Sequence, residues 1–154
     1  MPIKGTVKFM NNKIYKVTTS WIIKYQFQIF GSLSFKGHVN QSIRRKSLQH
    51  FWNRVDSHYF GSNRKKRIER ICINHVGYSN TNLHFHFLAK CPIFEDTHKF
   101  NAVLNLIWFE LKESGKYSKI ELINDNVAVA KYIGHEIYKI GTDIINTETS
   151  YLPH

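Results

Sequence analysis

The segment that most constrains the fold is residues 83–89, LHFHFLA, in which apolar side chains alternate with two histidines. Strict alternation is typical of a β-strand, because successive side chains on a strand point to opposite faces of the sheet. Phe85 and Phe87 would then pack into the core. His84 and His86 would share the other face, about 7 Å apart along the backbone. The segment therefore predicts a sheet with one apolar face and one face that presents two imidazoles.

Three further stretches predict strands. The β-branched and aromatic residues 21–36 favour one or two strands with partial alternation. Residues 68–76 alternate in the same way, and a turn joins them to the histidine strand. Residues 118–123, SKIELI, predict another strand near the end of the chain.

Three helices are predicted between and after these strands. Ser47 is expected to cap the first helix, whose apolar residues recur at i, i+3, i+4 and i+7 until Gly61 ends it. Pro92 and Asp96 introduce the second helix, which carries an apolar stripe. Residues 125–140 form the third.

This order of elements predicts the fold class. Strands, a helix, two strands, a helix, a strand and a helix indicate one α+β domain over residues 1–154. We expect a largely antiparallel central sheet with helices packed on one face and the other face left available. Residues 1–20 look polar and weakly ordered or short-stranded, and residues 141–154 have little periodicity. Both ends are therefore expected to be peripheral.

Basic residues are concentrated in one region. The chain has 22 Lys and Arg against 11 Asp and Glu, a formal charge of +11. Residues 43–70 contain nine basic side chains against Asp56 and Glu69, and nine minus two gives +7. Such a field favours nucleic acid, because binding at phosphates releases counterions. A solvated basic surface is the alternative. The predicted nucleic-acid contacts are Arg44, Arg45, Lys46, Arg64, Lys65, Lys66, Arg67 and Lys131.

The composition also excludes several classes of protein. Cys72 and Cys91 form no CxxC pair, so a disulfide framework or a zinc knuckle is not expected. No secretory signal is visible, and no apolar run approaches the roughly 18 residues of a membrane span. We therefore expect a soluble, cytoplasmic protein with buried thiols and no membrane partner.

The two strand histidines are candidate metal ligands. On a rigid strand, two imidazoles can converge on one cation without the ordering cost of a loop. If the preceding strand pairs antiparallel with theirs, His75 can approach His84 and His86, and three histidines suit a first-row metal. The alternative is two solvated or hydrogen-bonded strand histidines, with His75 a turn residue.

A second group of polar side chains lies on the last predicted helix, in VAVAKYIGHEIYKIG (127–141). At about 100° per residue, Tyr132, Glu136 and Lys139 form a stripe beside the apolar one. The alternative is an amphipathic boundary tyrosine with exposed neighbours. Gly134 in mid-helix is unfavourable by about 1 kcal/mol relative to Ala. It is also a place where another group can approach the backbone closely.

These two groups together resemble the HUH (histidine–hydrophobe–histidine) endonucleases, which include rolling-circle replication initiators (Rep proteins), relaxases and single-strand transposases. The resemblance covers most of the chain, without residues 1–20 and the tail. It rests on four segments in order: FGSLSF (30–35), HFWNRVDSHYFG (50–61), RIERICINHVGYSNTNLHFHFLAKCP (67–92) and VAKYIGHEIYK (129–139).

The resemblance implies a ferredoxin-like or RRM-like sheet with metal-bound histidines at its centre. It also implies a tyrosine that attacks a DNA phosphate and leaves a 5′-phosphotyrosine and a free 3′-hydroxyl. By position, His84 and His86 correspond to the metal ligands and Tyr132 to the nucleophile. The implied cofactor is a divalent metal, manganese or magnesium.

Two departures from the family pattern concern the remaining site residues. Many relatives have an acidic third ligand upstream, where this chain offers His75. Many have a lysine three or four residues after the tyrosine, where this chain has His135 and Glu136, with Lys139 a turn later. Some transposase relatives take the third ligand at i+4, which is Glu136 here. The third ligand is therefore His75 or Glu136, with a slight preference for His75.

The resulting functional prediction is a metal-dependent single-stranded DNA endonuclease and strand transferase that initiates rolling-circle replication. Tyr132 would be the nucleophile, and Lys139 or Lys131 would steady the phosphate charge. The expected partners are single-stranded DNA or an origin hairpin, and a host helicase and polymerase. The alternatives are a single-strand transposase, a non-catalytic nucleic-acid-binding module on an RRM-like sheet, and a relative that has lost activity.

Overall fold

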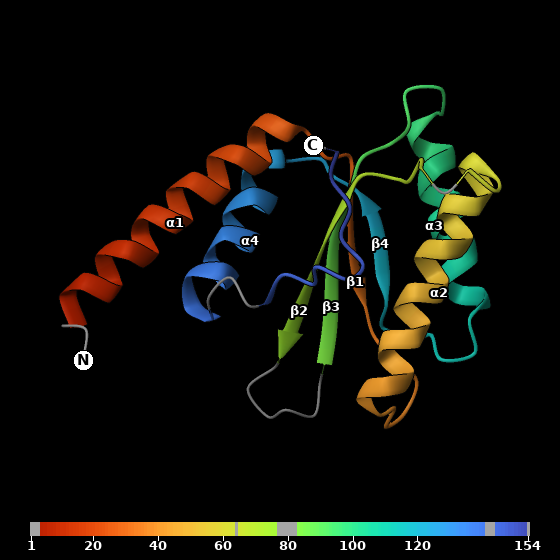
Figure 1. Cartoon of the computed structure of the whole chain (residues 1–154), viewed down its shortest axis with the longest axis horizontal. Coiled ribbons are helices and arrows are strands. Elements are labelled where there is room, and N and C mark those ends of the chain that lie inside the picture. Colours follow the sequence, from red (N-terminus) through yellow and green to blue (C-terminus); the bar gives the residue numbers. More distant parts are fainter. Residues whose placement is uncertain (1–3, 64, 77–82, 141–143, 154) are drawn as a thin grey trace.

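The structure is a computed structural model that describes residues 4–63, 65–76, 83–140 and 144–153; within these, side chains are described except at residues 4–11, 75, 76, 83 and 140. In chain order the elements are α1 (Lys4–Tyr25), β1 (Ile29–Leu33), α2 (Gln41–Phe60), β2 (Arg70–Val76), β3 (Leu83–Ala89), α3 (Thr97–Glu110), β4 (Lys119–Leu122) and α4 (Asn126–Ile140) (Figure 1). No helix within these described residues is long and apolar enough to cross a membrane.

The four strands form one antiparallel sheet in the order β2-β3-β1-β4. From β1 to β4 the chain runs strand, helix, strand, strand, helix, strand, which is consistent with a ferredoxin-like fold. The predicted α+β class with an antiparallel sheet is therefore confirmed. The histidine strand, β3, lies at the centre and pairs with β1 on one side and β2 on the other.

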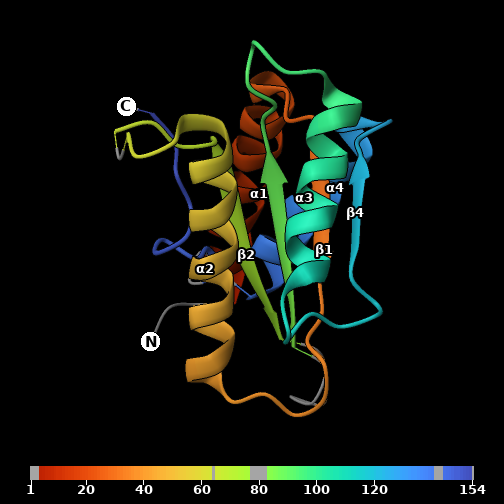
Figure 2. The same cartoon turned by 90° about the vertical axis from the view of Figure 1, so that its right-hand side faces the viewer.

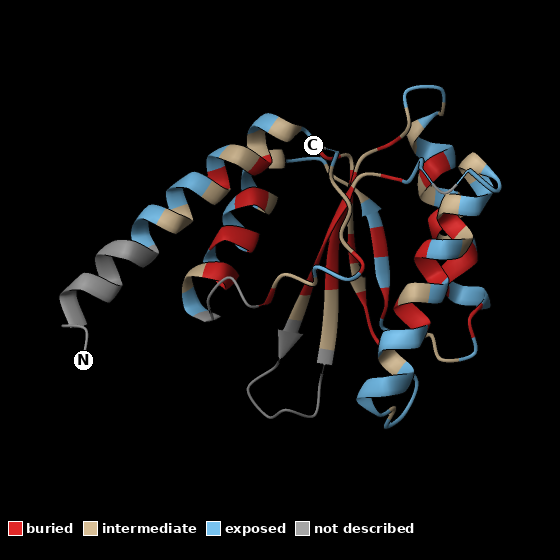
Figure 3. Ribbon diagram, in the orientation of Figure 1, coloured by how far each residue is buried: buried red, intermediate tan, exposed pale blue. Residues whose placement is uncertain are grey.

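The first face of the sheet holds the larger core. Phe85 and Phe87 point to this face as predicted, and the Phe87 ring lies 5.0 Å from the Trp52 ring and 6.1 Å from the Phe51 ring. α2 and α3 cover this face with their buried sides (Figures 2 and 3). Trp108 on α3 packs edge-on against Phe51 at 5.5 Å, so the two helices and the sheet share one aromatic cluster.

The second face is also covered, so the expectation of helices on one face only is wrong. α1 and α4 pack on this side (Figure 1). The physical reason is that β2 and β3 carry apolar residues on both faces. Ile71, Ile73 and Leu88 point away from the first core, and they are buried with Ile22 of α1 and Ile133 of α4.

The start of the chain also differs from expectation, because α1 spans 22 residues where a weakly ordered or short-stranded start was predicted. The same helix includes residues 21–25, which were assigned to a strand. Thr19 and Ile22 are buried one turn apart, so contact with α4 selects helical over extended backbone here.

The remaining helix boundaries follow local capping. Asn40, not Ser47, caps α2, because its Oδ1 accepts a hydrogen bond from the Ile43 N–H at 2.9 Å. Five of the six residues before Ser47 are polar, so the apolar pattern does not reveal this start. Gly61 at φ +59° ends α2 as predicted, and Asp96 caps α3.

The C-terminal tail lies along the outer edge of β2. The backbones of Arg70 and Tyr151 exchange hydrogen bonds of 2.8 and 2.9 Å, and the Asn146 N–H donates to the Cys72 carbonyl at 2.8 Å. An exposed strand edge is a site for unwanted pairing between chains. The tail, which looked peripheral in the sequence, therefore shields one edge of the sheet.

α1 and α4 approach each other closely at Gly134. A Cβ atom at this position would lie 2.5 Å from Thr19 Oγ1 and 3.2 and 3.3 Å from two ring atoms of Tyr15. The expectation that another group approaches Gly134 is confirmed, and the approaching group is α1. Thr19 Oγ1 is itself buried with no hydrogen-bond partner among the described residues.

We expect Gly134→Ala to lower the free energy of unfolding by about 1–3 kcal/mol through overpacking. At a solvent-exposed helix position the same change would raise the free energy of unfolding by about 1 kcal/mol. Urea unfolding measures the difference. The double variant Thr19→Ala/Gly134→Ala is the matched control and should recover part of the loss. A stabilised Gly134→Ala protein would contradict this packing.

Candidate active site

The candidate site lies where α4 crosses the centre of the sheet. Tyr132, in the middle of α4, places its hydroxyl oxygen 3.5 Å from Nε2 of His86 on β3. The two rings are nearly perpendicular, with centroids 5.7 Å apart. The structure therefore brings together the tyrosine and one of the two histidines that the sequence singled out, although 46 residues separate them.

A side chain on the neighbouring strand β1 forms a hydrogen bond with the His86 ring. Ser32 on β1 is directly opposite His86 in the strand register, and its Oγ lies 2.8 Å from His86 Nδ1. If Nδ1 carries the ring hydrogen and donates it to Ser32, the Nε2 lone pair faces the tyrosine. The imidazole is also buried, with 6% exposure, so its orientation is restricted.

An aromatic side chain, Phe30, contacts both His86 and Tyr132. The Phe30 ring stacks on His86 with centroids 5.5 Å apart and an interplanar angle of 12°. The same ring meets Tyr132 edge-on at 6.1 Å. The sequence interpretation missed the roles of Phe30 and Ser32. The sequence did contain the information. Phe30 and Ser32 are two residues apart on one strand, so their side chains point to the same face, which is the face of the histidines.

Tyr132 is a boundary residue with a perturbed hydroxyl. Its side chain is 43% exposed. Partial burial raises the pKa of the phenol, and the negative charge of Glu136 raises it further. Both effects disfavour the phenolate, so Tyr132 is a neutral phenol at neutral pH. A nearby positive charge is needed to activate it as a nucleophile.

Two of the other predicted ligands lie on the elements that carry this pair. Glu136, one turn beyond Tyr132, is buried with 8% exposure, and strand alternation puts His84 on the same sheet face as His86. The backbone of His75 is paired with that of His84, but the side chain of His75 lies outside the described residues.

The chemistry of these donors fits a divalent first-row metal. Two imidazoles and a carboxylate are suitable ligands, and the Ser32 contact to the far nitrogen of His86 is the kind that orients a metal-binding imidazole. Among the described side chains, no group of three or more His, Cys, Asp or Glu is already arranged around a metal position. The side chain of His75 is outside this set.

The predicted DNA-contacting residues lie mostly elsewhere. Lys131 is exposed on α4, as is Lys139, which was predicted to steady the phosphate charge. The other described ones lie at the two ends of α2, about 30 Å apart for a 20-residue helix, in the layer across the sheet from Tyr132 (Figure 1). Arg44, Arg45 and Lys46 are at its start; Lys65, Lys66 and Arg67 follow its end. Arg64 lies outside the described residues.

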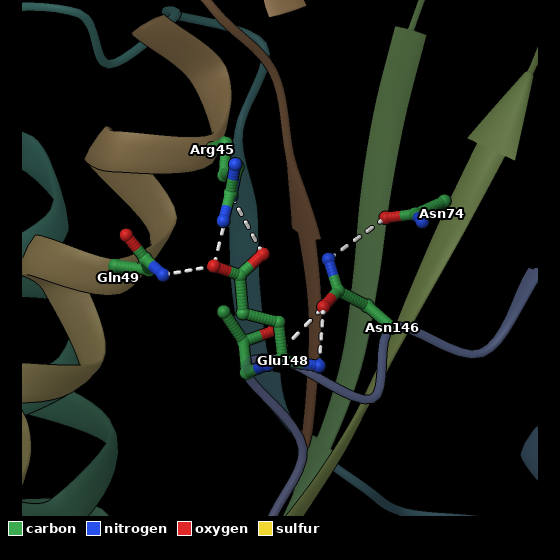
Figure 4. A network of polar contacts seen from close by, with 6 residues as sticks. Arg45, Gln49, Asn74, Asn146 and Glu148 are labelled. Atoms are coloured by element: carbon green, nitrogen blue, oxygen red, sulfur yellow. Dashed lines mark hydrogen bonds and ion pairs between the residues drawn. The ribbon is translucent and has the colours of Figure 1, made fainter. Parts of the chain in front are cut away.

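Internal contacts engage several of these cations. The Arg45 Nε donates to both carboxylate oxygens of Glu148 in the tail, at 2.8 and 2.9 Å, and Gln49 contacts the same carboxylate (Figure 4). Arg44 donates to the Val39 carbonyl at 3.0 Å. The structure therefore does not bring the α2 cations to the His86–Tyr132 pair.

Comparison of the chain with protein-family models, curated proteins and solved structures finds no match. Function is therefore inferred from the residues of the site.

We expect Glu136→Gln to lower the pKa of Tyr132 toward the ordinary value of about 10, because it removes the negative charge that opposes the phenolate. Burial remains, so the pKa should stay above that value. Titration of ¹³Cζ-labelled tyrosine by NMR measures it, with Tyr132→Phe to assign the signal.

The matched control is Glu121→Gln, which removes an exposed carboxylate on β4. It should leave the pKa of Tyr132 unchanged. A Tyr132 pKa that is the same or higher in Glu136→Gln would contradict the arrangement of these two side chains.

Proposed function

We propose that this protein is a metal-dependent single-stranded DNA endonuclease and strand transferase of the HUH type, with Tyr132 as its nucleophile. The observation that carries the proposal is the 3.5 Å approach of the Tyr132 hydroxyl to His86 Nε2. A nucleophile and a histidine from distant parts of the chain meet at a half-exposed position on a rigid sheet. The resemblance to HUH segments supports the same assignment.

Tyr132 would attack the phosphorus of a DNA phosphodiester. Its oxygen forms the new bond to phosphorus, the bond from phosphorus to the 3′-oxygen breaks, and that oxygen takes a proton. The phenol proton can pass to water, because the side chain is 43% exposed. The phosphotyrosine remains a diester, so the 3′-hydroxyl can attack it and rejoin the strands.

The residues that would hold a divalent ion are His84 and His86, with Glu136 or His75 as the third ligand. Such an ion neutralises charge on the phosphate oxygens and favours the phenolate. Glu136 is buried and lies one turn beyond Tyr132 on α4, so this candidate ligand belongs to the same helix as the proposed nucleophile. Ser32 and Phe30 fix the His86 ring, and Lys131 and Lys139 lie on the exposed side of α4 for the DNA backbone.

The biological step proposed is the nick that begins rolling-circle replication of a phage, plasmid or similar element. A single-strand transposase would use the same chemistry. A non-catalytic RRM-like module is less well supported, because such modules stack bases on an open sheet face and both faces are covered here.

The deciding experiment incubates the protein and Mn²⁺ with a random-sequence pool of single strands labelled at either end. A 5′-phosphotyrosine leaves the protein attached to the downstream fragment. The 3′ label should therefore move with the protein on a denaturing gel, and the 5′ label should not. We expect Tyr132→Phe and chelation to reduce the adduct to background.

Tyr138→Phe is the matched control, because it changes a half-buried tyrosine six residues further along α4. It should retain the adduct. An adduct that persists in Tyr132→Phe, or its absence from the wild-type protein, would contradict the proposed chemistry.

A further inference from the structure

A second feature of the surface is a groove of about 530 Å³ between the end of β1 and the loop that joins α3 to β4. Its lining includes three aromatic side chains and two lysines: Phe35, Phe109, Tyr117, Lys36 and Lys116. The volume lies within the usual range for small-molecule sites. Neither the sequence resemblance nor the proposed cleavage chemistry accounts for this groove.

The floor of the groove is fixed to the core. Phe35 packs edge-on against Phe85 and Trp108, with ring centroids 5.6 and 5.7 Å apart. The Lys36 N–H donates to the Glu113 carbonyl, and the Gly115 N–H to the Ser34 carbonyl, both at 2.8 Å. The loop is therefore tied to the strand that carries Ser32.

The walls of the groove are exposed. Tyr117 is 78% exposed and Phe109 is 47% exposed. Exposed aromatic rings are unfavourable in water, so two on one groove indicate a partner that covers them. Because the floor is fixed, these rings offer a preformed platform.

The positive charge of the groove indicates an anionic partner. No carboxylate is among the residues that line it within the described chain. The Lys116 Nζ lies 5.1 Å from the centre of the Tyr117 ring. Lys119 is nearby in sequence, but it is paired with Glu121 at 3.1 Å. Aromatic rings beside lysines are the combination that binds single-stranded nucleic acid, through base stacking and phosphate contacts.

We propose that this groove binds an unpaired base of single-stranded DNA against Tyr117 and Phe109, with Lys36 and Lys116 on the adjacent phosphates. This inference rests on the proposed function, because it assigns the groove to the strand that Tyr132 cleaves. Phe35 is three residues beyond Ser32, about 10 Å along the backbone. It lies on the opposite sheet face, so a strand bound at both places passes around the end of β1.

The test measures binding without cleavage, in a Tyr132→Phe background. The probe is a fluorescein-labelled dT20 strand followed by anisotropy. Tyr117→Ala should weaken binding by about 5- to 100-fold, the usual range for loss of one base-stacking aromatic. Tyr117→Phe keeps the ring and should stay within about twofold of the parent. Lys116→Gln should reduce the slope of log K against log salt by about one.

Phe94→Ala is the matched control, because Phe94 is 69% exposed on the segment that precedes α3 and does not line this groove. It should also stay within about twofold. Equal binding by the Tyr117→Ala and Phe94→Ala variants would overturn the proposal, as would tighter, Tyr117-dependent binding of U20 RNA. If the wild-type protein forms no adduct, the cleavage proposal fails alone, because this assay requires no cleavage.

Discussion

The pairing of β1 with β3 at the centre of the sheet is the constraint on which the rest of the structure depends. Their register sets Ser32 opposite His86 and Gly31 opposite Phe87. A Cβ atom on Gly31 would overlap the Phe87 ring, so the glycine allows that ring to lie against the strand. Because side chains alternate, the same register directs Phe87 into one core and His86 to the other face. A slip of one residue would exchange these environments.

The second layer of helices gives the histidine face its chemical character. α1 and α4 bury apolar residues of β2 and β3, and this contact fixes the height of α4 above His86. Tyr132 consequently sits at the border of the layer, half exposed and close to the buried carboxylate of Glu136. The same burial that positions the phenol also raises its pKa. As the nucleophile that we propose, Tyr132 needs a positive charge beside it, and His84 and His86 are suitable ligands for a metal ion that supplies one.

Fewer basic side chains are exposed and unpaired in the folded chain than the formal charge suggests. Arg70, one of the nine basic residues in the 43–70 region, is only 3% exposed. Its guanidinium forms an ion pair with Asp56 at 2.8 Å and lies 4.6 Å from the centre of the Trp52 ring. Arg45 is engaged by Glu148. Basic composition alone thus overestimates the positive charge that is exposed at the surface.

The sequence by itself determined the elements whose signals are local. Alternation placed β3 at residues 83–89 and turned Phe85 and Phe87 inward, and Asp96 and Gly61 marked helix ends through their own backbone and side-chain chemistry. The tertiary structure alone decided the α1 helix, the partner of His86 and the path of the tail. These depend on contacts between residues far apart in the chain, such as Ser32 with His86 or Arg70 with Tyr151. A local pattern can state which face a side chain occupies, but only packing determines what meets it there.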